Sequence, residues 1–278
     1  MTIDMVIPYV DNKDEVWKKT YLDFCKKYNL RLKIAELHTC RFDDIGLINY
    51  QLKLVEKNMP FINKIYLLVS NIEQVPSDIN KDKVVVVLHK DFIPYHCLPI
   101  FNSCAIEMYL WNIPNLSEYF IYANDDMLPC GELKESDFFE NGKIRIKWLN
   151  DDISVRKNTQ FKYQCLNGYR LINNLKCDTT QFIRPVHSFT PMIKSHCKET
   201  YDTHRIYIEH SISRFRTYEN YNQYIYPLYE LKKYGTLESD IDFYYTENEV
   251  DINHQIVCIN KVPNGKEQEI KYKLGALL

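Results

Sequence analysis

The sequence predicts an α/β fold in which a mostly parallel sheet is flanked by helices and followed by a helical C-terminal part. Three short apolar runs, at residues 64–70, 83–89 and 120–123, are rich in Val, Leu, Ile and Tyr. Runs that are apolar throughout, rather than alternating, are typical of strands buried on both faces, as in a parallel sheet. Helical spacing recurs before the first run and before the third, and this order of elements is that of an α/β protein.

The elements expected in the first half can be placed in chain order. A first strand at residues 4–10 is interrupted by a proline and followed by the dipeptide "DN". A helix is expected at residues 45–57, where apolar side chains recur at steps of three and four residues and a proline follows. Another helix is expected at residues 102–113, and either Asn102 or Ser103 could cap it. Ligands of such sheets bind outside the carboxyl ends of the strands, so residues just after the strands are candidates for a site.

The second half of the chain has weaker signals. Residues 130–185 are expected to be irregular, apart from a helix at residues 160–174. Residues 187–235 are rich in aromatic side chains and predict helices that end at Gly235. The remainder, residues 236–278, is polar with short strand-like pieces.

Composition and charge argue against several classes of protein. The 278 residues carry 35 Lys and Arg against 37 Asp and Glu, and a net charge of −2 is not that of a protein that coats nucleic acid. No apolar run approaches the roughly 18 residues that span a bilayer, and the first ten residues lack the features of a signal peptide. The nine cysteines are scattered without a C-x-x-C spacing, so we expect reduced, mostly buried thiols in a cytosolic protein. With seven glycines and no glycine-rich phosphate loop, P-loop and dinucleotide-binding sites are not expected.

The stretch "YFIYANDDM" carries the strongest single signal. Its apolar run ends in Asn124, Asp125 and Asp126, so two carboxylates follow a buried strand directly. Adjacent like charges are unfavourable unless a cation lies near them. Mg²⁺ or Mn²⁺ would fit, because these ions take oxygen ligands and bridge carboxylates to substrate phosphates. The alternative is a solvated turn, since an acidic dipeptide alone is a weak signal.

Two further acidic segments have equally good structural explanations. Asp11, with Asp14 in "YVDNKDEVW", could contact a nucleotide or a metal, or could form an Asx turn and cap a helix. Arg41 and Asp44, in "RFDD", could bind substrate or could form a surface turn before a helix. The residues themselves do not choose between these alternatives.

Basic candidates lie between residues 187 and 216. His187 precedes an expected helix and could act as a base, although lone histidines are more often structural. Arg214 and Arg216 could clamp a phosphate, because guanidinium matches phosphate oxygens bidentately, or could belong to a solvated face. A zinc site in this region is not expected, because four nearby residues lack the spacing of known zinc modules. They are His196, Cys197, His204 and His210.

Several phrases, in order, resemble the Stealth family of sugar-1-phosphate transferases. The opening "DMVIPYVDNKDEVW" resembles the first signature of that family. Residues 41–127 resemble its longest block, through "RFDDIGLINYQLKLVEKNMPFINKIYLLVS", "HKDFIP", "LPIFNSCAIE" and "FIYANDDM". Residues 187–235 resemble a third block, through "FRTYENYNQY". Residues 236–278 match no block of the family.

The resemblance implies one catalytic domain over residues 1–278 with a Rossmann-like, GT-A-like sheet. Residues 1–130 would be the core that binds a nucleotide sugar, residues 131–235 the helical part that completes the active site, and residues 236–278 a C-terminal extension. The family includes bacterial capsule polymerases, so the implied reaction moves a sugar-1-phosphate from a nucleotide sugar to a glycan hydroxyl and releases a nucleoside monophosphate. The implied donor is a UDP-sugar, and the implied acceptor is a glycan or a lipid-linked oligosaccharide of capsule or surface polysaccharide synthesis.

The resemblance also assigns roles to residues. Asp125 and Asp126 would hold Mg²⁺ or Mn²⁺ against the diphosphate, and Asp126 would count among the catalytic residues. His187 would be the general base and Arg216 would stabilise the phosphoryl group. The substrate-binding residues would be Asp11, Arg41, Asp44, Asn102, Ser103, Glu107, Asn124 and Arg214.

The chain departs from the family at "LINY", residues 47–50, where a Glu-Leu-Arg-Tyr phrase is usual. Roles that the family gives to that acid and that arginine are therefore not carried over. A GT-A-type glycosyltransferase is the alternative, since it would use the same acidic pair and metal but release a nucleoside diphosphate. A non-catalytic carbohydrate-binding or scaffolding protein is a third reading, which the paired carboxylates and arginines disfavour. The expected location is the cytoplasm, and the tyrosine-rich segment 218–234 could touch the inner face of the membrane, although such aromatics are more often core.

Overall fold

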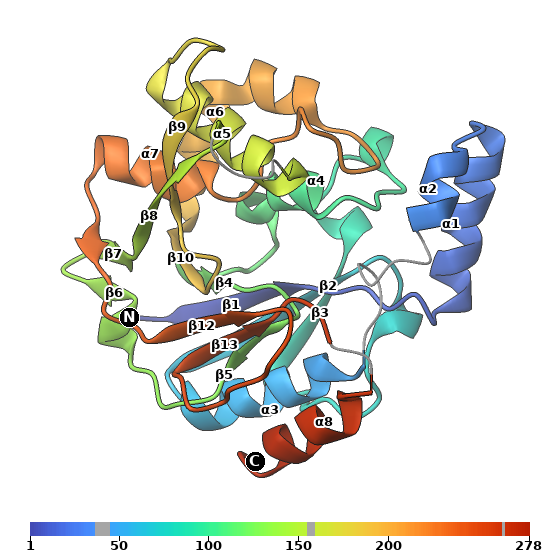
Figure 1. Cartoon of the computed structure of the whole chain (residues 1–278), viewed down its shortest axis with the longest axis vertical. Coiled ribbons are helices and arrows are strands. Elements are labelled where there is room, and N and C mark those ends of the chain that lie inside the picture. Colours follow the sequence, from blue (N-terminus) through green and yellow to red (C-terminus); the bar gives the residue numbers. More distant parts are fainter. Residues whose placement is uncertain (37–44, 155–158, 263–264) are drawn as a thin grey trace.

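A five-stranded sheet lies at the centre of the molecule (Figure 1). The structure is a computed structural model, and it describes residues 1–36, 45–154, 159–262 and 265–278. The order across the sheet is β10-β4-β1-β2-β3. These strands are β1 (Ile3–Pro8), β2 (Ile62–Val69), β3 (Val84–Leu88), β4 (Tyr119–Tyr122) and β10 (Thr190–Ile193). The strands β1 to β4 run parallel and β10 is antiparallel to β4, so the predicted α/β class is confirmed.

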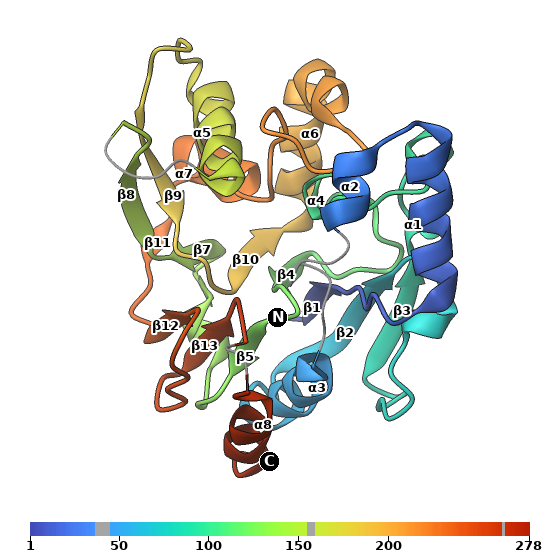
Figure 2. The same ribbon diagram turned by 45° about the vertical axis from the view of Figure 1, so that its right-hand side comes forward.

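Helices cover both faces of this sheet (Figures 1 and 2). The helices α3 and α8 lie on one side, α4 to α7 lie on the other, and α1 packs with α2 at one end of the sheet. Their bounds are α1 (Glu15–Lys27), α2 (Arg31–Glu36), α3 (Leu47–Asn58), α4 (Ser103–Glu107), α5 (Gln160–Asn173), α6 (Lys194–Ser211), α7 (Ile225–Lys233) and α8 (Glu267–Gly275).

Neighbouring residues of each central strand point into different hydrophobic cores. In β1, Val6 belongs to the core beneath α4 to α7, whereas Ile7 belongs to the core against α3. In β2, Leu68 belongs to the first of these cores and Leu67 to the second. Both faces of these strands are thus buried, which explains why the sequence is apolar throughout these runs.

Within the described residues, three smaller sheets flank the central one. One consists of β12 (Phe243–Thr246), β13 (Ile256–Ile259) and β5 (Met127–Pro129), in that order. A second consists of β11 (Leu237–Glu238), β7 (Lys143–Ile146) and β6 (Phe139–Glu140), and a third of β8 (Trp148–Asp152) and β9 (Gln181–Pro185). Since β5 directly follows β4, the sheet made with β13 brings the C-terminal segment beside the end of the central sheet.

The helices expected at residues 45–57 and 160–174 are confirmed as α3 and α5. Three other expectations are wrong. The segment 130–185 contains the strands β6 to β9, and the expected helix at 102–113 is the short α4 followed by a 3-10 turn. The residues just after His187 form the strand β10 rather than a helix, because they pair with β4 at the edge of the central sheet. Pro191 is tolerated there, since an edge strand can spare a backbone N–H.

The cysteines of the described residues are mostly buried, as expected. All are buried except Cys177, which is exposed, while Cys40 lies outside the described residues. No helix in the described ranges combines the length and the apolar character needed to cross a bilayer.

Candidate active site

The loops that follow the parallel strands meet at one edge of the sheet. Those after β1 and β2 are joined because Asn71 Nδ2 donates to Asp14 Oδ2 at 2.7 Å. Asp14 also accepts from the amide of Val16 and caps α1, which is the structural role that the sequence left open. Asp11 accepts from the Lys13 amide at 2.9 Å in an Asx-type turn. These contacts hold the loop between β1 and α1 in place beside the sheet.

A buried glutamine fixes the turn that carries the acidic pair. Gln51 of α3 is fully buried, and its Nε2 donates to the carbonyl oxygens of Asn124 at 2.7 Å and Met127 at 2.6 Å. Between these anchored residues, Asp125 and Asp126 are half-buried. Oδ1 of Asp126 is buried and has no hydrogen-bond partner among the described residues. A buried carboxylate oxygen in this state is unfavourable unless a ligand or a cation contacts it.

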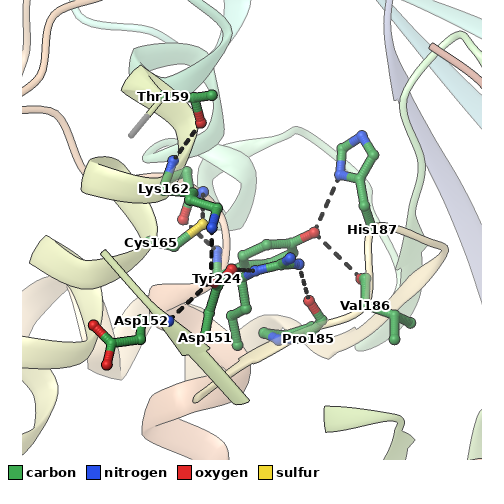
Figure 3. Close-up of polar contacts among 11 residues, drawn as sticks. Asp151, Asp152, Thr159, Lys162, Cys165, Pro185, Val186, His187 and Tyr224 are labelled. Carbon is green, nitrogen blue, oxygen red and sulfur yellow. Dashed lines mark hydrogen bonds and ion pairs between the residues drawn. The ribbon is translucent and has the colours of Figure 1, made fainter. Parts of the chain in front are cut away.

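A chain of hydrogen bonds joins this turn to His187. Tyr122 Oη donates to Asn124 Oδ1 at 2.9 Å, which directs the amide nitrogen of Asn124 toward His187 Nε2 at 3.4 Å. On the other side of the ring, His187 Nδ1 lies 3.2 Å from Tyr224 Oη, which donates to the carbonyl oxygen of Val186 at 3.3 Å (Figure 3). This arrangement makes Nε2 the unprotonated nitrogen and leaves the ring proton on Nδ1.

The surroundings of His187 favour the neutral imidazole. Burial lowers the pKa of His187, the carboxylate of Asp126 opposes this, and the cations of Arg184 and Arg216 lower the pKa further. Phe161 contacts the imidazole edge-on, with 5.4 Å between ring centroids. A neutral imidazole has a nitrogen lone pair that can accept a proton from a substrate.

A half-buried ionic cluster supports the loop that carries His187 (Figure 3). Asp151 of β8 accepts from Lys162 Nζ at 2.8 Å and from Arg184 Nε at 3.0 Å. Burial raises the pKa of Asp151, but these hydrogen bonds outweigh that effect and hold the pKa below its usual value. Arg184 also lies over the ring of Phe161, with 5.6 Å to its centroid. The cluster therefore ties β8, β9 and α5 together next to His187.

Glu107, Ser103 and Arg216 form a second group on the same side. Glu107 is 3% exposed, and its carboxylate accepts from Tyr122 Oη at 3.1 Å and from the Gln223 amide at 2.8 Å. Burial raises the pKa of Glu107, and the guanidinium of Arg216 opposes that rise. Arg216 donates to Ser103 Oγ. Tyr122 is the contact shared between this group and the hydrogen-bonded chain around Asn124.

The structure does not bring Asn102 and Arg214 into these groups. Asn102 is 1% exposed, caps α4, and donates to the Ser213 carbonyl oxygen at 2.9 Å. Arg214 donates to the His96 carbonyl oxygen at 2.8 Å. Both side chains tie the segment after α6 to the chain before α4.

Arg41, Asp44 and His196 are not part of these groups as the structure describes them. Arg41 and Asp44 lie outside the described residues. His196 lies 2.7 Å from Glu230 Oε2 and stacks on Tyr234, so it links α6 to α7.

A thiol from the C-terminal segment reaches the acidic turn. Cys258 of β13 pairs with Met127 of β5, and the Ile259 amide donates to the Asp126 carbonyl oxygen at 2.9 Å. Within the described ranges, one group of three potential metal ligands comes together, with ligand atoms of Asp126, His187 and Cys258 all within 4.8 Å of one another. Burial raises the pKa of Cys258, and the neighbouring carboxylate of Asp126 raises it further.

The donor atoms at this turn are of two kinds. The carboxylates of Asp125 and Asp126 are what Mg²⁺ or Mn²⁺ would take, and the unpartnered Oδ1 of Asp126 is an available position for such an ion. The imidazole nitrogen of His187 and the sulfur of Cys258 suit a softer ion. The acidic pair therefore fits a hard cation, whereas the three-residue group does not.

Aromatic residues line an open hollow near Arg216. The hollow has a volume of about 590 Å³ and is lined by Tyr163, Asn167, Tyr218 and Glu219. The rings of Tyr163 and Tyr218 meet edge-on at 5.4 Å. Gln160 donates to the Arg216 carbonyl oxygen at 3.1 Å, so the start of α5 holds both the hollow and Arg216.

Four residues of the site were not predicted. Tyr122 lies within "YFIYANDDM", and a hydroxyl at the end of a predicted strand is a signal that could have identified it. Gln51 follows directly after the departure at "LINY", but nothing in the sequence marks it as the anchor of a distant turn. Tyr224 and Cys258 have no local signal, because long-range packing alone brings them to His187 and Asp126.

Comparison with known proteins identifies one family model. Residues 41–147 match the Stealth protein CR2, conserved region 2. That segment includes α3, β2, β3, α4, β4 and the turn with the acidic pair.

Curated relatives carry consistent names. The chain is 36% identical over 173 residues to the capsular polysaccharide phosphotransferase WcwK of Streptococcus pneumoniae, covering 62% of this chain and 50% of the relative. It is 32% identical over 223 residues to the capsular polysaccharide phosphotransferase fcs1 of Haemophilus influenzae, covering 77% of this chain and 60% of the relative. It is 35% identical over 176 residues to the exopolysaccharide phosphotransferase cps2G of Lactiplantibacillus plantarum, covering 62% of this chain and 49% of the relative. The chain thus spans about half to three-fifths of the length of these relatives.

Proposed function

Because the chain belongs to the Stealth family, we propose that it transfers a sugar-1-phosphate from a nucleotide sugar to a glycan hydroxyl, in capsule or exopolysaccharide synthesis. The observation that carries this proposal is the contact between Asn124 and His187 beside the acidic pair, in a chain whose relatives are named phosphotransferases. A base next to carboxylates that can hold a cation is what phosphoryl transfer to a hydroxyl requires.

In the proposed reaction, Nε2 of His187 accepts the proton of the acceptor hydroxyl. The oxygen forms a bond to the phosphorus nearest the sugar, and the bond from that phosphorus to the nucleoside phosphate breaks. A nucleoside monophosphate leaves with the electron pair of that bond. The neutral state of His187 suits this role, and Asn124 and Tyr224 orient the ring.

Electrostatic stabilisation of the phosphoryl oxygens is the second requirement. Arg216 would supply it, with its guanidinium held at Ser103 and near Glu107. Asp125 and Asp126 would hold Mg²⁺ or Mn²⁺, which would neutralise charge on the diphosphate. Ser103 remains a candidate for contact with a donor hydroxyl, and Asp11 for contact with the nucleotide. Asn102, Glu107 and Arg214 are better explained as positioning residues, because their side chains are used in internal hydrogen bonds.

The acceptor would lie along the hollow formed by Tyr163 and Tyr218. Aromatic faces with neighbouring amide and carboxylate groups can pack against the apolar faces of a sugar and bond to its hydroxyls. The segment 217–219 follows Arg216 directly, so a glycan in the hollow would end near the phosphoryl group.

The proposal extends to the arrangement of the core, the number of catalytic domains, the donor and the location. We propose a GT-A-like arrangement of the core, one catalytic domain, a UDP-sugar donor, and action in the cytoplasm at the inner face of the membrane. The order of strands β4-β1-β2-β3, with the acidic pair after β4, supports the first of these. The departure from the family at "LINY" leaves one alternative, a glycosyltransferase that releases a nucleoside diphosphate. The names of the relatives do not favour it.

The deciding experiment resolves the released nucleotide. The protein is incubated with a panel of nucleotide sugars, Mg²⁺ and a mixed glycan acceptor, and the nucleotide is separated as mono- or diphosphate. We expect the monophosphate together with a phosphodiester signal in the ³¹P spectrum of the product. A diphosphate with a plain glycoside would overturn the proposal in favour of a glycosyltransferase.

A further inference from the structure

The group of Asp126, His187 and Cys258 comes from three distant parts of the chain. Asp126 follows β4, His187 precedes β10, and Cys258 lies on β13. Their ligand atoms lie within 4.8 Å of one another. In a tetrahedral zinc site the ligand atoms stand about 3 to 4 Å apart, so a side-chain shift of about 1 Å would complete the arrangement.

Each of the three residues offers one ligand atom to the group. Oδ1 of Asp126 is buried and has no hydrogen-bond partner among the described residues. His187 directs Nε2 toward the acidic turn, where its contact is the 3.4 Å approach of the Asn124 amide. Cys258 is fully buried on the strand beside that turn.

The second contact of His187 is the one that metal-bound histidines usually make. Such a histidine donates its other ring N–H to a fixed partner, which sets the tautomer and the ring orientation. Here that partner is Tyr224, whose Oη lies 3.2 Å from Nδ1 (Figure 3). The ring is therefore already oriented with Nε2 toward the turn that carries Asp126.

We propose that Asp126, His187 and Cys258 form a binding site for a divalent transition-metal ion of the zinc class, and that its occupancy inhibits the transfer reaction. Sulfur and nitrogen ligands select such an ion over Mg²⁺, which takes oxygen. Binding releases the thiol proton, so that a thiolate–metal bond forms and one proton leaves to solvent. The inhibition, but not the binding, rests on the proposed function, since the metal would occupy the lone pair with which His187 accepts the hydroxyl proton.

Binding is tested without any reference to activity. The full chain, stripped with a chelator, is titrated with Co²⁺ while the thiolate-to-cobalt absorption is followed. We expect one equivalent to bind, to be displaced by Zn²⁺, and to resist a large excess of Mg²⁺. Absence of the absorption band, or its loss on adding Mg²⁺, would overturn the proposal.

Matched variants locate the ion. Cys258→Ser should lose the band and weaken Zn²⁺ binding by at least the roughly tenfold that the loss of a residue supporting a ligand costs. Cys197→Ser is the control, because Cys197 is equally buried but lies on α6 outside the group. Asp126→Asn is the second variant, used should Cys258→Ser melt at a lower temperature than the parent. A band that persists in both site variants would place the ion elsewhere and refute the assignment.

Inhibition is then measured as activity with Zn²⁺ relative to the same protein without it. We expect inhibition in the parent and in Cys197→Ser, reversal by a chelator, and about tenfold higher Zn²⁺ for the same effect in Cys258→Ser. Cobalt binding without inhibition would remove the regulatory part alone. Cobalt binding in a protein that transfers nothing from any nucleotide sugar would instead count against the proposed function and leave the metal site standing.

Discussion

The side-chain amide of Asn124 lies 3.4 Å from Nε2 of His187, although 63 residues separate them in the sequence. This contact joins the turn after β4 to the loop before β10. It also connects the acidic pair to the imidazole of His187, so the proposed base lies beside the proposed cation-binding pair.

Replacement of His187 tests the proposed base. His187→Ala should lower kcat by about 10²-fold or more, because general base catalysis contributes that much, while the KM for the donor changes little. His210→Ala is the control, since His210 is exposed at the end of α6 and should keep full activity. Steady-state kinetics on both variants decide the matter. Full activity in His187→Ala would remove the assignment.

Arg216 and Arg214 are separated by one residue, but the structure predicts opposite effects for them. Arg216→Lys should lower kcat by about tenfold or more with an unchanged melting temperature, because lysine cannot bind phosphoryl oxygens bidentately. Arg214→Lys should lower the melting temperature and leave kcat nearly unchanged, because Arg214 donates to backbone carbonyl oxygens. Paired thermal melts and kinetics check this, and equal effects on kcat would contradict it.

The central sheet could be predicted because its signal is local. The runs Ile65–Val69 in β2, Val84–Leu88 in β3 and Tyr119–Tyr122 in β4 are continuously apolar, which is typical of strands buried on both faces. The position of the acidic pair at the end of a strand could be predicted for the same reason, since the pair directly follows a buried run in the sequence.

The strand β10 and the thiol of Cys258 could not be predicted. Residues 190–193 become a strand only through pairing with β4, and the aromatic residues nearby suggested a helix instead. Cys258 reaches Asp126 because β13 pairs with β5, which is more than a hundred residues earlier in the chain. Such contacts depend on tertiary packing, which overrides local propensity.

Asp151 predicts how stability depends on pH. Asp151→Asn should lower the free energy of unfolding at pH 7 by about 1–3 kcal/mol, because Lys162 and Arg184 are half-buried and would lose their charged hydrogen-bond acceptor. The folded state depresses the pKa of Asp151, so its stabilising effect is complete above the unfolded value of about 3.9 and is lost as the pH falls through the folded value. The difference in the free energy of unfolding between the parent and Asp151→Asn should thus stay constant from pH 7 to about pH 4 and become smaller below pH 4.

Urea denaturation of both proteins across this range is the measurement. Asp78→Asn is the control, because Asp78 forms an exposed pair with Lys53 and such pairs contribute little. A difference for Asp151→Asn that narrowed well above pH 4, or that matched the control at pH 7, would contradict the role given to this cluster.

Tyr218 tests the acceptor side of the site. Tyr218→Ala should raise the KM for the glycan acceptor by about tenfold, which corresponds to the 1–1.5 kcal/mol of an aromatic contact, and should leave the KM for the donor unchanged. Tyr207→Ala is the control, because Tyr207 is also exposed but lies on α6. An increase in the KM for the donor instead would show that the hollow binds the donor and not the acceptor.

The close packing of α5 on α7 predicts that the effect of Gly168→Ala on stability changes sign when the side chain of Ile225 is shortened. A Cβ added at Gly168 would stand 2.9 Å from Cγ2 of Ile225, which is closer than carbon atoms normally approach. Replacing a helical glycine by alanine favours the helix by about 0.5–1 kcal/mol, whereas overpacking costs about 1–3 kcal/mol. Gly168→Ala should therefore destabilise the parent by about 1 kcal/mol.

In the Ile225→Ala background the clashing methyl group is gone, so the same substitution at Gly168 should become stabilising. Gly275→Ala serves as the reference, because nothing lies within 4 Å of the added Cβ, and it should raise stability in either background. Chemical denaturation of the four Gly168 and Ile225 combinations gives the coupling free energy. An identical loss from Gly168→Ala with and without the isoleucine would mean that the helix backbones, rather than this methyl contact, set the distance between α5 and α7.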